Sequence, residues 1–139
     1  TEEPEDYLIT KHGMKVIRVP EVRKKGTAAA VLAALEHLQH CDLLYVSFDV
    51  DSLDPSISGG TGTPVEDGLT VEEAATLLKT FAKEPRLGCM EFTEINPLLD
   101  HQGNAMGEVA FRLISQTVRE LEERSKTIPG LNSFLSTHE

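Results

Sequence analysis

The sequence is short of cysteines, basic residues and long apolar runs, and each shortage bears on the class of protein. Cys41 and Cys89 are the two cysteines, and their places in or beside predicted strands favour buried free thiols over a disulfide. Thirteen Lys and Arg face 23 Asp and Glu, and a net charge of −10 argues against nucleic-acid or anionic-membrane partners. No apolar run approaches the roughly 20 residues of a membrane span, and the N-terminus, TEEPEDY, is unlike a signal peptide. We therefore expect a cytoplasmic protein whose surface suits cations or cationic substrates.

The 139 residues are enough for one compact domain with a real core, but not for two. Apolar spacing, a Thr70/Glu73 capping signature and Pro or Gly stops predict strands that alternate with helices. Such alternation predicts an α/β fold with a parallel sheet covered by helices, whose ligands bind beyond the carboxyl ends of the strands. We expect residues 1–7 to be a loop or a fraying end. Strands are expected at Met14–Val19, Leu43–Phe48 and Leu87–Ile95, and helices at Thr27–His40, Val71–Lys83 and Asn104–Arg124.

Asp49 and Asp51 follow the second predicted strand and carry the main chemical signal. Side chains two apart on extended backbone point to the same side, so the two carboxylates can converge. Converging carboxylates are costly unless a cation or a shared proton lies between them, and oxygen ligands suit magnesium, calcium or manganese. The alternative is that one carboxylate caps the next turn while the other faces water.

Two known metal-binding loops fail on spacing. A calcium-binding EF-hand loop that starts at Asp49 would need Gly in place of Asp54 and Glu in place of Gly60. A phosphatase of the Asp-x-Asp type would want a small β-branched residue where Leu53 stands. The aspartate pair therefore has to be interpreted with its neighbours in the sequence.

Three motifs in order resemble the ureohydrolases, the family of arginase, agmatinase and formimidoylglutamase. They are FDVDSLDP at residues 48–55, GGTGTP at 59–64 and EINP at 94–97, preceded by GMKVIRVPEV. The resemblance is strongest to the C-terminal half of an arginase, because EINP is similar to arginase's version of that motif. It implies the arginase-like fold, three-layer αβα with a parallel sheet, of which residues 1–125 form the C-terminal portion and residues 126–139 a tail.

The resemblance also implies a set of site residues. Asp49 and Asp51 would be two ligands of a pair of manganese ions, and Glu94 would pair with a substrate guanidinium. Thr63 matches a substrate-contacting position, although a turn-forming role suits it equally, and Glu3 stands where the family has an acidic residue that binds the substrate α-amino group. Outside the ligand set, Asp54 is interpreted as a residue that steadies the loop, and His12 and His101 as solvent-exposed.

The implied reaction is hydrolysis of L-arginine to L-ornithine and urea by a hydroxide that bridges the two manganese ions, as in arginine metabolism and the urea cycle. The family's other metal ligands, in histidine motifs and Asp-x-His-x-Asp, do not occur in these 139 residues. We therefore expect a fragment that is inactive alone and needs an N-terminal half or a complementary chain, in a homo-oligomer such as a trimer or hexamer. The alternatives are agmatinase, formimidoylglutamase or a non-catalytic interaction module.

Overall fold

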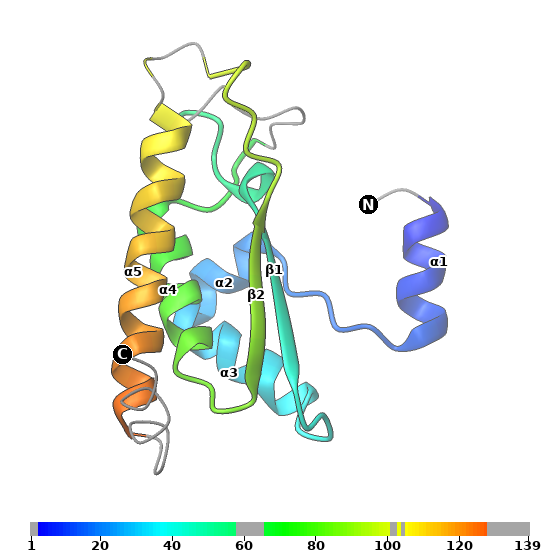
Figure 1. Ribbon diagram of the computed structural model, residues 1–139. Helices are drawn as coiled ribbons and strands as arrows, with labels where there is room; N and C mark the ends of the chain where they lie inside the picture. The colour runs from blue at the N-terminus through cyan, green and yellow to red at the C-terminus, as the bar shows by residue number, and fades with distance from the viewer. Residues whose placement is uncertain (1–2, 58–65, 101–102, 104, 128–139) are drawn as a thin grey trace. The chain divides into compact units, whose positions relative to one another are not determined.

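The chain divides into two compact units, Thr1–Cys41 and Asp42–Glu139, which are described separately. A computed structural model describes residues 3–57, 66–100, 103 and 105–127. Figure 1 shows the elements of each unit along the chain. Within the described residues, no helix combines the length and the apolar character that crossing a membrane requires.

The first unit contains α1 (Glu3–His12), α2 (Val19–Lys25) and α3 (Thr27–His37). For residues 3–7 the expectation of a loop or a fraying end is wrong, because α1 begins at Glu3. Acidic side chains fill its first turn, and Lys11 and His12 lie in its last turn, an arrangement that complements the helix dipole. The acidic residues near the N-terminus therefore form the first turn of a helix.

The predicted strand at Met14–Val19 is also wrong. Residues 14–18 have no regular secondary structure, and α2 starts at Val19. Pro20 fits the first turn of a helix because its fixed φ suits that position, and Glu21 Oε2 accepts the Arg18 N–H at 3.5 Å. The last residue of the expected strand, Val19, is therefore the first residue of α2. This helix packs on α3.

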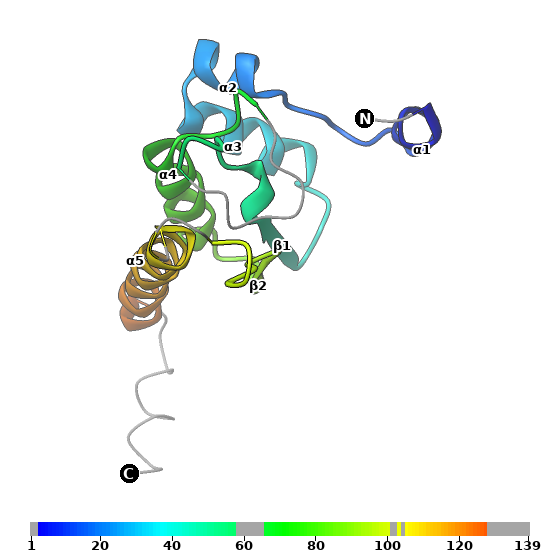
Figure 2. The same cartoon turned by 90° about the horizontal axis from the view of Figure 1, so that it is seen from above.

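The second unit is built on two parallel strands, β1 (Leu44–Asp49) and β2 (Leu87–Thr93). A short 3-10 helix, η1 (Val50–Ser52), follows β1 directly. The two long helices are α4 (Val71–Ala82) and α5 (Ala105–Thr127). The two views show α4 and α5 packed side by side on one face of the strand pair (Figures 1 and 2).

The core of the second unit lies between this sheet face and the two helices. In β1, Leu44 and Phe48 are buried and Val46 between them is half-buried. The Phe48 and Phe92 rings meet at 5.6 Å between centroids. Apolar positions at helical spacing supply the other side of the core. The most deeply buried large side chains of the unit are Leu78, Met106, Leu113, Val50 and Thr117.

The three predicted helices and two of the three predicted strands are confirmed, with ends that differ by up to three residues. Thr70 and Glu73 form the predicted capping box: Thr70 Oγ1 accepts the Glu73 N–H at 3.1 Å, and Glu73 Oε2 accepts the Thr70 N–H at 2.9 Å. The fold is α/β, with parallel strands as expected.

Candidate functional site

The candidate site lies where β1 and β2 end side by side. The register pairs Asp49, the last residue of β1, with Thr93, the last residue of β2. Glu94 follows Thr93 directly, so the two carboxylate-bearing segments leave the sheet at the same edge. This is the edge at which parallel α/β sheets bind ligands.

Asp49 and Asp51 are arranged by a turn rather than by an extended strand. Asp49 ends β1 while Asp51 lies in η1, so the expected strand alternation does not relate them. Asp49 Oδ1 accepts the Asp51 N–H at 2.8 Å, and the Asp49 carbonyl accepts the Ser52 hydroxyl at 2.6 Å. The Asp49 side chain is exposed, whereas Asp51 is half-buried and its Oδ1 is fully buried. The Asp49 carboxylate thus caps the next turn, as the alternative interpretation allowed. Its Oδ2 takes no part in the bond to the Asp51 N–H.

The segment after the aspartates is tied to the residues that precede α4. Asp54 N–H donates to the Leu69 carbonyl at 2.9 Å, and Leu69 N–H donates to the Ser52 carbonyl at 2.8 Å. Asp54 Oδ1 accepts both the backbone N–H and the hydroxyl of Ser56. Asp54 is therefore a turn residue, which confirms its interpretation as a residue that steadies the loop.

Gly68 permits this contact because it has no side chain. A Cβ at Gly68 would stand 2.7 Å from both the Asp54 nitrogen and the Leu53 carbonyl carbon. These are backbone atoms that cannot move aside independently of the loop. The sequence interpretation missed this residue, although the Asp67-Gly68 pair is a turn signal.

Glu94 is exposed and has an unusual backbone conformation. Its φ is +62°, and among the described non-glycine residues only Asp67, at +59°, shares a positive φ. A non-glycine residue in this region costs roughly 1–3 kcal/mol and persists where its surroundings fix it. Such strain is frequent at functional sites, so Glu94 is a candidate site residue. The strain alone assigns it no role.

Glu91 of β2 lies on the same sheet face as Asp49. It pairs across the sheet with Ser47, two residues before Asp49, and Ser47 Oγ donates to Glu91 Oε1 at 2.9 Å. Hydrogen bonds from Tyr45 and then Ser47 hold the pKa of Glu91 below its usual value. Strand alternation together with the register would have predicted that Glu91 lies near Asp49. Its carboxylate is hydrogen-bonded two residues before the ends of the two strands.

The remaining predicted positions are placed as follows. Thr63 and His101 lie outside the described residues, and so does the tail from residue 128. Glu3 lies exposed in the first turn of α1, in the first unit. His12 is exposed at the end of the same helix, as expected.

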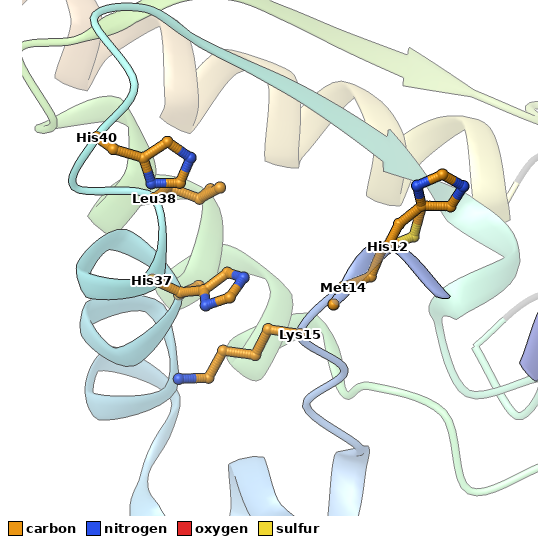
Figure 3. Close-up of a pocket in the computed structure, with 8 residues that line it drawn as sticks. His12, Met14, Lys15, His37, Leu38 and His40 are labelled. Atoms are coloured by element: carbon orange, nitrogen blue, oxygen red, sulfur yellow. The ribbon is translucent and has the colours of Figure 1, made fainter. Parts of the chain in front are cut away.

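His12 also lines a cavity of about 470 Å³ in the first unit. Figure 3 shows His37 and His40 on one wall, from the end of α3 and the turn after it, with His12 and Met14 on the opposite side. Lys15 Nζ donates to the Ala33 carbonyl at 3.0 Å, so its ammonium is engaged with α3. Among the residues that the structure describes, these imidazoles do not form a three-ligand metal group.

The chemistry of the strand-end donors fits a hard metal ion, and their number fits only part of a site. Asp49 and Asp51 offer carboxylate oxygens, which suit manganese or magnesium. In the described ranges, no group of three His, Cys, Asp or Glu side chains is arranged to hold a metal ion. The two aspartates could therefore contribute to a metal centre that further ligands complete.

Comparison with known proteins gives a consistent result. The Arginase family model matches residues 1–119. An arginase of Brevibacillus brevis is 38% identical over 112 residues, which are 80% of this chain and 37% of that protein. The chain thus spans well under half the length of the curated relatives it matches.

Two solved structures extend the comparison. The crystal structure of arginase from Bacillus subtilis matches with a TM-score of 0.76 and 33% identity, over 84% of this chain and 39% of that one. A formiminoglutamase of Trypanosoma cruzi, solved with Mn²⁺, matches with a TM-score of 0.75 and 29% identity, over 86% and 40%. Both matches cover most of this chain and a minority of the solved one.

Proposed function

Because the chain belongs to the arginase family, we propose that the protein it is part of hydrolyses L-arginine to L-ornithine and urea. Support for this substrate comes from relatives that are named arginase, such as those of Bacillus subtilis and Brevibacillus brevis. The match covers 37–38% of those two proteins, so the reaction is proposed for the whole protein. This chain alone is proposed to be inactive.

The observation that carries the proposal is the pairing of Asp49 with Thr93 at the ends of β1 and β2. It brings a candidate metal-binding segment and a candidate substrate-binding carboxylate, Glu94, to one sheet edge. Hydrolysis of a guanidinium needs this combination, because the nucleophile and the cationic substrate have to meet.

Asp49 and Asp51 would hold part of a manganese pair through their carboxylate oxygens. The formiminoglutamase of Trypanosoma cruzi, a related structure that contains Mn²⁺, supports the choice of metal. When bound, the two ions would lower the pKa of a water molecule and so supply the nucleophile. In this chain the hydrogen bond from Asp51 N–H to Asp49 Oδ1 orients the Asp49 carboxylate.

Glu94 would bind the substrate guanidinium. A carboxylate accepts short, charge-assisted hydrogen bonds from the planar guanidinium N–H groups and so fixes the position of the carbon that is attacked. The exposed side chain and the fixed left-handed backbone of Glu94 suit a residue that presents its carboxylate to a ligand. Thr63 and Glu3 are proposed as further substrate contacts, Glu3 toward the α-amino group.

A second candidate is formimidoylglutamase, since the Trypanosoma cruzi formiminoglutamase is 29% identical and has a similar fold. Agmatinase is a third candidate with the same type of reaction. The proposed metal ligands would be shared by all three reactions, so the choice between them depends on the substrate that is hydrolysed.

The test is the intact mass and manganese content of the full-length protein, followed by product assays. We expect close to two manganese ions per active site and urea release from L-arginine that exceeds turnover of agmatine and formimidoylglutamate. D51N should lose manganese, while the matched D54N, which keeps an oxygen acceptor for the Ser56 turn, should retain it. Full manganese binding by D51N would remove Asp51 from the ligand set, and absence of turnover with all three substrates would overturn the proposed function.

A further inference from the structure

The segment from Thr93 to Leu99 holds Glu94 between two fixed points. On one side, β2 ends at Thr93, which is paired with Asp49. On the other side a tight turn begins at Asn96. Only Glu94 and Ile95 connect these points, so the position of the turn limits the backbone angles that Glu94 can adopt.

The turn is closed by two hydrogen bonds to Asn96. Its side-chain Oδ1 accepts the Leu98 N–H at 3.0 Å, and its backbone carbonyl accepts the Leu99 N–H at 3.1 Å. Asn is favoured at the first position of such a turn and Pro at the second, where Pro97 stands. The sequence pair Asn-Pro therefore specifies a turn two residues after Glu94.

Beyond the turn, the segment is anchored to α5. Asp100 Oδ2 accepts the Gly107 N–H at 3.1 Å, in the first turn of that helix. The turn is thus fixed at its far end by a packed helix and at its near end by the sheet. The hydrogen bond from the Leu98 N–H to the Asn96 side chain closes the turn two residues after Glu94.

We infer that Asn96 is a positioning residue, which acts through its turn to hold Glu94 at φ +62° and its carboxylate toward the substrate guanidinium. The strained backbone of Glu94 requires surroundings that fix it, and the Asn96 side chain supplies one of the bonds that do so. This assigns Asn96 a mechanical role, with no contact to substrate or metal. The inference rests on the proposed role of Glu94.

The experiment compares N96A with N96D in the full-length, manganese-loaded protein. N96A removes the acceptor for the Leu98 N–H, and we expect kcat/KM for L-arginine to fall about tenfold, mainly through KM, as for other supporting residues around a site. N96D keeps an oxygen in the same place and should return KM to within about twofold of the original value. Manganese content should be unchanged in both variants.

E84A is the matched control for loss of stability. Glu84 Oε1 accepts the Arg86 N–H at 3.3 Å, so it bonds a backbone amide two residues ahead, as Asn96 does, but at the opposite end of β2. It should lower the melting temperature without raising KM. A KM for N96A within twofold of the original, or an equal defect in N96D, would overturn the inference.

A crystal structure of N96A separates this inference from the proposed function. We expect Glu94 to leave the left-handed region in N96A and to retain it in N96D. If the full-length protein turns over no guanidino substrate, the proposed function fails, and the φ of Glu94 still decides whether Asn96 sets its conformation. An unchanged φ in N96A would overturn the inference on its own.

Discussion

At the scale of single residues, Gly68 has the closest backbone neighbours among the glycines of the described ranges. Its absent Cβ would stand 2.7 Å from backbone atoms of Leu53 and Asp54. We predict that G68A lowers the free energy of unfolding by about 1–3 kcal/mol, because the loop that carries the aspartates has to shift. Chemical denaturation of the two proteins measures this difference.

G88A is the control for that prediction. A Cβ at Gly88 would lie 3.6 Å from the Leu43 Cδ2, an ordinary contact with a flexible side chain. Its unfolding free energy should stay close to that of the original protein. Equal effects of G68A and G88A would show that the backbone approach at Gly68 is not tight.

The two strained residues, Glu94 and Asp67, make a matched pair for a second prediction. Both have φ near +60°, a region that glycine enters without steric cost. We predict that E94G and D67G each raise the free energy of unfolding by about 1 kcal/mol. E94G should also abolish most of the turnover, whereas D67G should leave it unchanged.

Thermal denaturation and the urea assay together check this pair. Stabilisation by D67G but not by E94G would mean that the Glu94 side chain makes contacts worth more than its strain. Retained turnover in E94G would remove Glu94 from the substrate site.

The identity of these residues was more predictable than their geometry. Motif resemblance singled out Asp49, Asp51 and Glu94, because short sequence patterns fix residue types. It could not show that Asp51 lies in a 3-10 turn bonded to Asp49, since a one-residue change of backbone direction leaves the pattern unaltered. The left-handed φ of Glu94 was hidden for the same reason, as no glycine marks it.

At the scale of elements, Arg124 joins α5 to the connection between α4 and β2. Its guanidinium donates to the Glu84 carbonyl at 2.5 Å and to the Leu87 carbonyl at 3.2 Å. We predict that R124M lowers the free energy of unfolding by about 2 kcal/mol, because two carbonyls lose a charged donor. R119M, on the exposed side of the same helix, should change it by less than about 0.5 kcal/mol.

Equilibrium unfolding of R124M and R119M measures the difference. A loss in R119M as large as in R124M would attribute the effect to the charge of the helix rather than to the two bonds. The comparison is clean because both substitutions remove an arginine from α5.

Glu84 gives the same connection a dependence on pH. The hydrogen bond from Arg86, at 2.6 Å, is the main cause that lowers the pKa of Glu84 below its usual 4.5. A carboxylate with a lowered folded-state pKa stabilises the protein above its unfolded pKa and loses this contribution as pH falls through the lowered value. We predict that E84Q is less stable than the original protein at pH 7 and that the difference shrinks below pH 4.5.

Unfolding curves at pH 7, 4.5 and 3 check the sign. A difference that grows as the pH falls would mean that Glu84 is stabilised as the neutral acid. K83Q serves as the control. Lys83 precedes Glu84 in the chain, and its exposed side chain pairs with Glu120 at 3.7 Å, so little effect is expected.

Elements with strong local signals were predictable, and those that depend on neighbours were not. The capping box at Thr70 and the apolar spacing that follows it mark α4 within one residue. In α5, Thr117 is buried and Val118 is exposed, the reverse of what hydrophobicity suggests, because Thr117 Oγ1 bonds the Leu113 carbonyl at 2.8 Å. Residues 14–18 have strand-like composition, but a strand requires a partner to bond with, and composition does not supply one.

At the scale of the whole molecule, the α/β class follows from alternation of elements, whereas the extent of the sheet does not. In the described part of the chain, the sheet has the two strands β1 and β2. An isolated pair of strands has two open edges, and parallel sheets are normally larger and covered on both faces. The relatives are more than twice as long as the matched region, which is consistent with further strands in the whole protein.

Metal binding at this scale gives the last prediction. Two manganese ions take about six ligands each, and Asp49 and Asp51 are the two proposed protein ligands in this chain. We predict that the isolated 139-residue chain binds manganese weakly and releases no urea, while the full-length protein binds close to two ions per active site. Equilibrium dialysis with metal analysis measures both, and D51N in each context is the control, since it should matter only where the site is complete. Tight binding of two ions by the isolated chain would mean that its own residues suffice, and the requirement for ligands from the rest of the protein would then be wrong.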